Sequence, residues 1–368
     1  MTRSLINRWL PGWVGLPRLD PVLLALVLLI ISFGLVVLYS ASDEDMAMVK
    51  RQVLRLGFGL VIMIAISQVP PRILRVWTPW LFGIGVLMLV ATWGLGVGRG
   101  TQRWLDLGVI RFQPSEIMKL AVPMMVAWYL HTRVLPPAGK AVAYSVGILL
   151  IPTLLIARQP DLGTALLVAA SGVFTLYLAG LRWRILFGLA GAFAAAIPVL
   201  WLLLKEYQRE RVRTFLNPEA DPLGHGWNII QSKIAVGSGG VSGKGWLNGT
   251  QSHLEFIPER HTDFILAVLS EEFGLIGVSL LMLVYLMLIA RGLHIASIAR
   301  DTFSRLLAGG LSLTLFVYVI VNGGMVSGLL PVVGVPLPLI SYGGTSAVTL
   351  LAGFGIMMSI YGHRKFIK

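Results

Sequence analysis

Long apolar stretches recur along almost the whole chain. About ten of them reach or approach the length of roughly 20 residues that a helix needs to cross a bilayer. We see no block of about ten residues with the alternating pattern of a transmembrane β-strand. The sequence therefore predicts an all-α integral membrane protein with about ten transmembrane helices, at roughly 21–40, 53–69, 75–95, 115–131, 140–157, 161–180, 184–204, 264–290, 303–330 and 339–361.

The remaining segments divide the chain. A basic N-terminal segment, 1–20, precedes the first span, and a short tail, 362–368, follows the last. Spans one to seven fill 21–204 and spans eight to ten fill 264–361, which leaves one long loop, 205–263, able to fold outside the bilayer. The first span is too long for a signal-peptide core, so we interpret it as a retained anchor.

Composition and charge narrow the class of protein. The chain is 56% hydrophobic and 13% charged, whereas a soluble domain is about 45–50% apolar and about 25% charged. It has no cysteine, which excludes disulfides, thiolate metal sites and a cysteine nucleophile. The formal net charge is +13. In a membrane protein this is typical of basic inner loops, anionic lipid or an anionic substrate, so we expect no nucleic acid partner.

The distribution of Lys and Arg predicts the orientation. The N-terminal segment, the C-terminal tail and the short loops on their side hold about twice as many cations as the short loops on the other side. Because cytoplasmic loops carry this excess, both termini are expected in the cytoplasm. The loop 205–263 is then extracytoplasmic.

Ionisable residues within spans are costly in lipid, which makes them candidates for function. Glu116 and Lys119 lie three positions apart on the fourth span and share one helix face. Asp161 opens the sixth span and Asp263 precedes the eighth, so all four are expected toward the outer leaflet. The same side of the last two spans carries three more polar residues: Asn322, Ser327 and Ser341. The pattern predicts an outward-opening polar site built by several helices.

These charged residues also have structural interpretations. Glu116 and Lys119 can form an ion pair that fixes helix packing. Asp161, which follows a proline, and Asp263 can each cap a helix. The adjacent acids Glu271 and Glu272 point in different directions on one helix, and at least one is expected to face other helices or a water-filled cavity.

The long loop contains a Gly-rich run, Gly237 to Gly245. It is not a P-loop, because Ser238 and Gly245 stand where that motif needs Gly and Ser or Thr. Two interpretations remain. The run is either a flexible hinge or a nest of backbone amides that binds an anion together with Lys244.

Several motifs occur together over most of the chain. They are Arg103-Trp104-Leu105 with Phe112 to Glu116 and Lys119; Gln159 to Thr164; Gln231-Ser232 with Gly237 to Gly240; Gly243 to Gly245; Pro258 to Phe264; and Pro331 to Pro338 with Ser341 to Gly344. In this combination the chain resembles the SEDS family (shape, elongation, division and sporulation). Within that family it is most similar to the branch that acts in cell elongation.

The resemblance implies a peptidoglycan glycosyltransferase in the cytoplasmic (inner) membrane of a bacterium. Such an enzyme polymerises lipid II into β-1,4 glycan strands at the outer face, for elongation and rod shape, so the active site is expected to face the periplasm. The family's catalytic carboxylate maps onto Asp263. The implied partners are lipid II, a class B penicillin-binding protein transpeptidase, other elongation-complex proteins and membrane lipids.

The implied reaction inverts the donor sugar at C1, so one general base is sufficient, and Asp263 is assigned to that role. The departing diphosphate needs positive charge. The residues expected to bind or support the substrate are Glu116, Lys119, Asp161, Lys233, Lys244, Arg209, Arg213 and Ser341. No motif predicts a metal site built by the protein. A divalent cation such as Mg²⁺, held by substrate phosphate and one carboxylate, stays open as a cofactor.

The loop 205–263 carries several cations beside its Gly-rich run, which leads to the hypothesis that it is a movable lid whose cations hold pyrophosphate. Two rival functions remain: a flippase for lipid II or another lipid-linked substrate, and a non-catalytic scaffold that activates the penicillin-binding protein. A transporter is less consistent with the sequence, because the polar groups cluster near one face and no inverted repeat is visible.

Overall fold

The computed structural model describes residues 19–97, 103–106, 111–203, 206–218, 226–253 and 259–363. The helices in these ranges are α1 (Pro21–Ala41), α2 (Met46–Ser67), α3 (Pro71–Leu95), α4 (Pro114–Leu130), α5 (Gly139–Arg158), α6 (Leu162–Leu178), α7 (Trp183–Leu203), α8 (Glu206–Leu216), α9 (Trp227–Ser238), α10 (Thr250–His253), α11 (Ile265–Ser297), α12 (Thr302–Val326) and α13 (Thr345–Gly362). Each predicted span overlaps one of these helices, and the all-α membrane fold is confirmed. Within the described ranges, six helices are long and apolar enough to cross a membrane.

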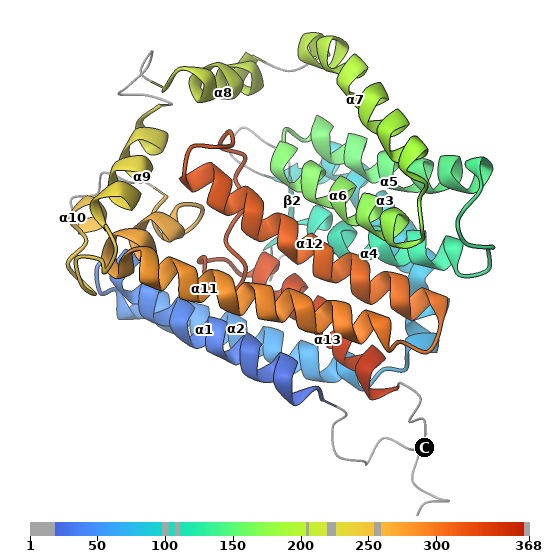
Figure 1. Ribbon diagram of the computed structural model, residues 1–368, viewed down its shortest axis with the longest axis horizontal. Coiled ribbons are helices and arrows are strands. Elements are labelled where there is room, and N and C mark those ends of the chain that lie inside the picture. Colours follow the sequence, from blue (N-terminus) through green and yellow to red (C-terminus); the bar gives the residue numbers. More distant parts are fainter. Residues whose placement is uncertain are drawn as a thin grey trace, which may run out of the picture.

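The helices form a bundle in which α4, α12 and α13 are the most enclosed (Figure 1). α12 packs between α11 and α6, and also contacts α4. α1 packs on α11, α2 on α13, and α3 on α4. Figure 1 shows α7 at the edge of this bundle, leading to α8. The outer helices α1 and α3 keep many apolar side chains exposed, as expected for surfaces that face lipid tails.

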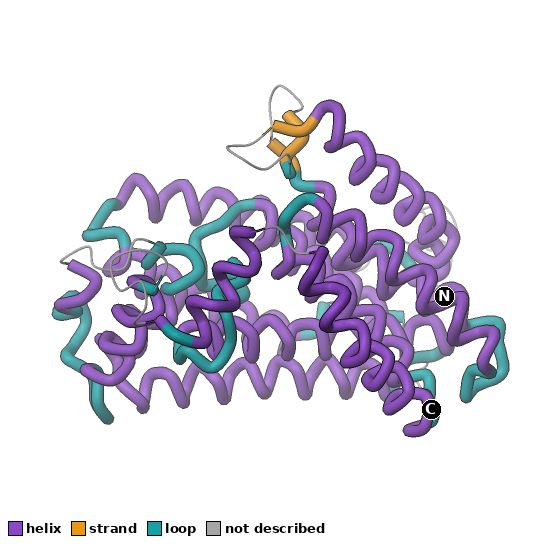
Figure 2. Tube along the Cα trace, turned by 90° about the horizontal axis from the view of Figure 1, so that it is seen from above, coloured by secondary structure: helices purple, strands orange, loops and turns teal. Residues whose placement is uncertain are grey.

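A small antiparallel sheet lies between α3 and α4. It consists of β1 (Gly96–Val97), β2 (Trp104–Asp106) and β3 (Arg111–Phe112), in the order β1-β2-β3. Leu105 pairs with Gly96 on one side and with Phe112 on the other. Figure 2 shows these strands at the edge of the molecule, beyond the end of α3. The sequence did not predict them, because strands of two or three residues have no period to detect.

Two interactions define one end of the bundle. Asp20, the N-cap of α1, forms an ion pair with Arg291 near the end of α11, with 2.8 Å between Oδ2 and Nε. The Arg291 guanidinium also lies 5.2 Å from the centre of the Tyr361 ring, at the end of α13. The first and last spans therefore begin and end at the same end of the bundle. In α11 the 23 residues after the non-helical Gly274, 275–297, alone extend about 35 Å at 1.5 Å each, so the Asp263 turn before the first residue of α11 lies toward the opposite end.

Candidate active site

Asp263 lies in a turn held by the rest of the bundle. The side-chain amide of Asn322 on α12 donates to the Asp263 carbonyl at 2.9 Å and to the Val335 carbonyl at 2.8 Å. The N-cap of α11 is Phe264, and no side chain caps that end. The capping interpretation of Asp263 is therefore wrong. Within the described part of the chain, its carboxylate oxygens have no hydrogen bond, so they can accept a proton.

A second segment, the loop before α13, fixes the same turn. The Ser341 hydroxyl donates to the Thr262 carbonyl at 2.6 Å and accepts from the Leu337 amide at 2.8 Å. The Tyr342 amide donates to the His261 carbonyl at 2.8 Å. Ser341, expected to bind or support substrate, is thus placed as a support for the main chain beside Asp263.

Burial and the neighbouring charges together raise the pKa of Asp263 to about 6. The largest cause is the burial of the carboxyl, followed by repulsion from Glu259. Arg211 on α8 acts in the opposite direction, and Asp161 adds a further raising effect. A carboxylate with this pKa is ionised at neutral pH and is a stronger base than an ordinary aspartate.

Asp161 is the N-cap of α6. One of its oxygens accepts from the Thr164 amide at 3.2 Å, and the other from the Gln113 side chain at 2.9 Å. Arg103 lies 3.8 Å from the second oxygen and donates to the Gln159 carbonyl at 2.9 Å. The capping interpretation of Asp161 is confirmed. The charge of Asp161 also raises the pKa of Asp263. Its role as a helix cap and its predicted role in the site therefore belong to the same end of the bundle.

Glu116 and Lys119 form the expected ion pair on α4. Lys119 Nζ lies 2.7 Å from Glu116 Oε1, and each side chain is only 5% exposed. The Lys119 ammonium also lies 5.2 Å from the centre of the Tyr318 ring on α12. Asn322, which holds the Asp263 carbonyl, follows Tyr318 by one helical turn. The pair therefore lies one turn deeper in the bundle than the Asp263 turn.

The candidate cations of the long loop are placed differently from one another. Arg209 donates to the carbonyls of Trp201 and Leu202 at the end of α7, at 3.0 and 2.9 Å. Arg213 pairs with Glu206 at 2.8 Å. Lys233 is exposed on α9, where its methylene groups approach Gly328. Their role in phosphate binding stays a prediction.

Arg211 lies between Arg209 and Arg213 in the sequence. It is the cation of α8 that lowers the pKa of Asp263. It also donates to the Val332 carbonyl at 3.4 Å. Arg209 and Arg213 are four positions apart and share one face of the helix, whereas Arg211 lies on another face. Helical periodicity alone can place Arg211 on a different face from the other two, but only the three-dimensional arrangement shows which face is turned toward the site.

Lys244 and two glycines of the Gly-rich run are closely packed against α11 in this structure. Lys244 Nζ lies 2.6 Å from Glu271 Oε1, and the Glu271 side chain is completely buried. A Cβ at Gly239 would lie 2.0 Å from the Ser270 carbonyl oxygen, and one at Gly243 would lie 2.1 Å from that of Glu272. These two glycines permit close backbone contact, and the flexible-hinge interpretation stays a prediction. A phosphate contact by Lys244 stays a prediction that requires this ion pair to open.

Glu272, the neighbour of Glu271, is also buried, and it accepts a hydrogen bond from Ser40 on α1. Both acids therefore face other elements of the protein rather than lipid. In the described ranges, no group of three His, Asp or Glu side chains is arranged to hold a metal ion.

Comparisons with known proteins agree over nearly the full length of the chain. The family model for FtsW, RodA and SpoVE, described as cell cycle proteins, matches residues 20–366. The peptidoglycan glycosyltransferase MrdB of Escherichia coli K12 is 55% identical over 353 residues, 95% of each chain. Stage V sporulation protein E of Bacillus subtilis is 34% identical over 362 residues, 94% of this chain and 98% of that protein.

Solved structures show the same fold. A chain of a peptidoglycan synthase complex, described for the coordination of polymerization and crosslinking, has a TM-score of 0.82 at 33% identity, covering 94% of this chain and 98% of that one. The rod shape determining protein RodA of Thermus thermophilus has a TM-score of 0.72 at 30% identity, covering 96% and 99%.

Proposed function

This chain belongs to the family of FtsW, RodA and SpoVE cell cycle proteins, and we propose that it polymerises lipid II into β-1,4 glycan strands with Asp263 as the general base. It is a multi-pass membrane protein and a peptidoglycan glycosyltransferase, the activity named for its relative at 55% identity. The observation that carries the proposal is the Asp263 carboxylate, which has a raised pKa and whose main chain is held by α12 and by the loop before α13.

The proposed reaction is a single inverting displacement. The 4-hydroxyl oxygen of the acceptor attacks C1 of the donor sugar while Asp263 takes the hydroxyl proton. The bond from C1 to the pyrophosphate oxygen breaks, and its electron pair leaves with the diphosphate. Because diphosphate is a good leaving group, the site needs cations more than a second acid. Two cations are candidates for this role. Arg211 lowers the pKa of Asp263 by its charge, and Lys233 is exposed on α9.

The proposed setting is the bacterial cytoplasmic membrane, with both termini in the cytoplasm and Asp263 at the periplasmic face. The positions of α1 and α13 support this, because their terminal ends meet at the end of the bundle opposite Asp263. A class B penicillin-binding protein is the proposed partner, since one solved relative belongs to a peptidoglycan synthase complex. A divalent ion would be bound chiefly by the substrate diphosphate, with one carboxylate from the chain.

Purified protein incubated with lipid II in detergent tests the proposal directly. A polymerase makes glycan strands without a membrane to cross, and their length can be measured on gels. A flippase or a scaffold makes none. If the purified chain makes no glycan alone or together with a penicillin-binding protein whose own active site is inactivated, the proposed activity is wrong.

We expect the polymerisation rate to fall as the pH is lowered through about 6. Only the ionised form of a general base accepts a proton, and the pKa of Asp263 is raised to about 6. At pH 7.5 nearly all of the protein is then competent, and at pH 5 only about a tenth is. Initial rates at saturating lipid II between pH 4.5 and 8 check this. A rate that stays constant down to pH 4.5 would contradict it.

Replacing Ser341 by alanine should lower the turnover about tenfold with a small loss of stability. The hydroxyl makes two hydrogen bonds that join the Thr262 carbonyl to the Leu337 amide, and each is worth about 1 kcal/mol. The main chain next to Asp263 would then be less well fixed. Polymerisation and thermal unfolding of Ser341→Ala should be compared with Ser297→Ala, whose hydroxyl bonds only to the His294 carbonyl near the end of α11. Equal turnover in the two variants would contradict this role.

A further inference from the structure

The helix that follows Asp263 is interrupted. At Gly274 the backbone of α11 has φ 61° and ψ −162°, which is not helical. In an unbroken helix the amides of Leu275 and Ile276 would donate to the carbonyls of Glu271 and Glu272, four residues earlier. Here the Leu275 amide donates to the Gly240 carbonyl at 3.0 Å instead, and that of Ile276 to the Val241 carbonyl at 3.1 Å.

The same loop satisfies the two carbonyls that the interruption leaves without helical partners. The Lys244 amide donates to the Glu271 carbonyl, and the Gly245 amide donates to the Glu272 carbonyl, both at 3.0 Å. We call residues Gly240–Gly245 the inserted loop. Its backbone replaces the missing helical hydrogen bonds on both sides of Gly274, so an interruption that would otherwise be costly in the bundle is stable.

Two glycines make this insertion sterically feasible. Gly243 has φ 80°, and a Cβ there would lie 2.1 Å from the Glu272 carbonyl oxygen. Gly274 has φ 61°, and a Cβ there would lie 2.3 Å from the Gly243 amide nitrogen. Any larger residue at either position is both strained and blocked by backbone. The inserted loop and the interruption in α11 are therefore built to fit each other.

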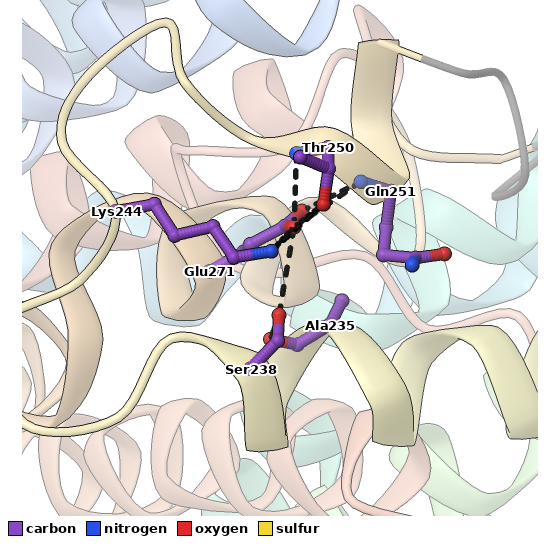
Figure 3. A network of polar contacts seen from close by, with 6 residues as sticks. All are labelled: Ala235, Ser238, Lys244, Thr250, Gln251 and Glu271. Atoms are coloured by element: carbon purple, nitrogen blue, oxygen red, sulfur yellow. Dashed lines mark hydrogen bonds and ion pairs between the residues drawn. The ribbon is translucent and has the colours of Figure 1, made fainter.

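Glu271 ties the inserted loop to the segments around it (Figure 3). Its Oε1 accepts from Lys244 Nζ at 2.6 Å, from the Thr250 amide and hydroxyl at 2.9 Å each, and from the Gln251 amide at 3.1 Å. The Ser238 hydroxyl, at the end of α9, lies 3.5 Å away. One buried carboxylate thus joins α9, the inserted loop and α10 to α11.

We propose that Glu271 and the inserted loop form a positioning element for Asp263. The segment Ile265–Phe273 comes directly after the Asp263 turn and ends at the interruption. The inserted loop anchors the end of this segment at the interruption, and Asn322 and Ser341 hold the turn before its start. This inference rests on the proposed function, in which Asp263 is the base. Glu271 touches no substrate in this scheme and acts only through the placement of Asp263.

Two substitutions disturb this element in different ways. Gly243→Ala prevents insertion of the loop, and Glu271→Gln keeps the length of the side chain but removes the charge that holds Lys244. We expect the first to lower kcat/KM on the order of 10²-fold, the size of effect that misplacement of a reacting group by about 1 Å produces, and the second to have a smaller effect in the same direction. Gly147→Ala on α5 is the matched control, because a Cβ there has open space.

The pH profile separates positioning from folding. Asp263 faces Glu259 in the preceding turn, Asp161 at the start of α6 and Arg211 on α8. Because burial is the largest cause of its raised pKa, loosening the turn should move the midpoint of the acid limb to lower pH. A loss of folded protein would lower the rate at every pH and leave the midpoint unchanged. An unshifted midpoint in both variants, or undiminished activity in both, overturns the proposal.

Hydrogen exchange gives a readout that does not depend on activity. In the wild type the amides of Lys244, Gly245, Leu275 and Ile276 should exchange slowly, and in Gly243→Ala they should exchange faster while α12 stays protected. Unchanged protection of these amides in Gly243→Ala also overturns the proposal. A different result is that Asp263→Asn is fully active while exchange in Gly243→Ala becomes faster as expected. The assignment of the base would then be wrong, but the packing of the inserted loop against α11 would still be supported. The two failures are therefore distinguishable.

Discussion

Asp263→Asn is expected to reduce glycan polymerisation by about 10²–10⁴-fold, the usual contribution of a general base, and to leave the protein folded. Asparagine has nearly the same shape but cannot accept the proton of the acceptor hydroxyl. Folding should be spared, because the contacts that hold this turn use the Asp263 carbonyl and the neighbouring main chain, not the carboxylate. The unfolding temperature is expected to rise slightly, since the substitution removes a carboxylate whose ionisation is disfavoured by burial and by Glu259.

The measurement is polymerisation of lipid II by purified wild type and variant at pH 7.5, with thermal unfolding of both in the same detergent. Asp45→Asn is a suitable control. Asp45 is the N-cap of α2, in the short connection between α1 and α2, and asparagine is an equally good cap. Near-normal turnover in Asp263→Asn would assign the base to another residue. Glu259 and Asp161 are then the next carboxylates to test, since both influence Asp263.

The apolar pattern was enough to predict the all-α membrane fold and the positions of its long helices, because a helix that crosses a bilayer needs a long run of side chains compatible with lipid. The start of α6 could also be predicted, since an aspartate behind a proline is a strong local signal for a helix start and Asp161 does cap it. Such signals depend on neighbouring residues only. That is why helix positions agreed to within a few residues for most spans.

The parts that sequence reasoning missed depend on residues far apart in the chain. The interruption at Gly274 is stable only because Gly240–Gly245 fills it, about 30 residues away, and no local pattern indicates this partnership. A glycine run that packs against backbone carbonyls looks the same in sequence as one that serves as a hinge. The sequence therefore did not predict the packing of the inserted loop against α11, whereas the family motifs around Asp263 pointed to segments that do meet.

Breaking the Glu116–Lys119 pair by a single substitution should cost about 3–5 kcal/mol of folding stability, because the remaining charge stays buried without its partner. The two side chains are 5% exposed and lie 2.7 Å apart. Glu116→Gln and Lys119→Met should each lower the unfolding temperature in detergent. The double variant should lose less than the sum of the two, because no uncompensated charge remains in it.

The exposed pair Arg213–Glu206 provides the matched control for this double-mutant cycle. Its charged atoms are 2.8 Å apart, but the two side chains are 53% and 66% exposed, so a coupling energy of only about 0–1 kcal/mol is expected. Equal coupling in the two cycles would contradict the assignment of Glu116 and Lys119 as a buried pair.

Activity of the double variant then decides between the two interpretations of the pair. If stability recovers and polymerisation also recovers, the pair only fixes packing. If stability recovers but polymerisation does not, the charges serve the site, and Tyr318 is the residue through which they would reach Asn322 and the Asp263 turn.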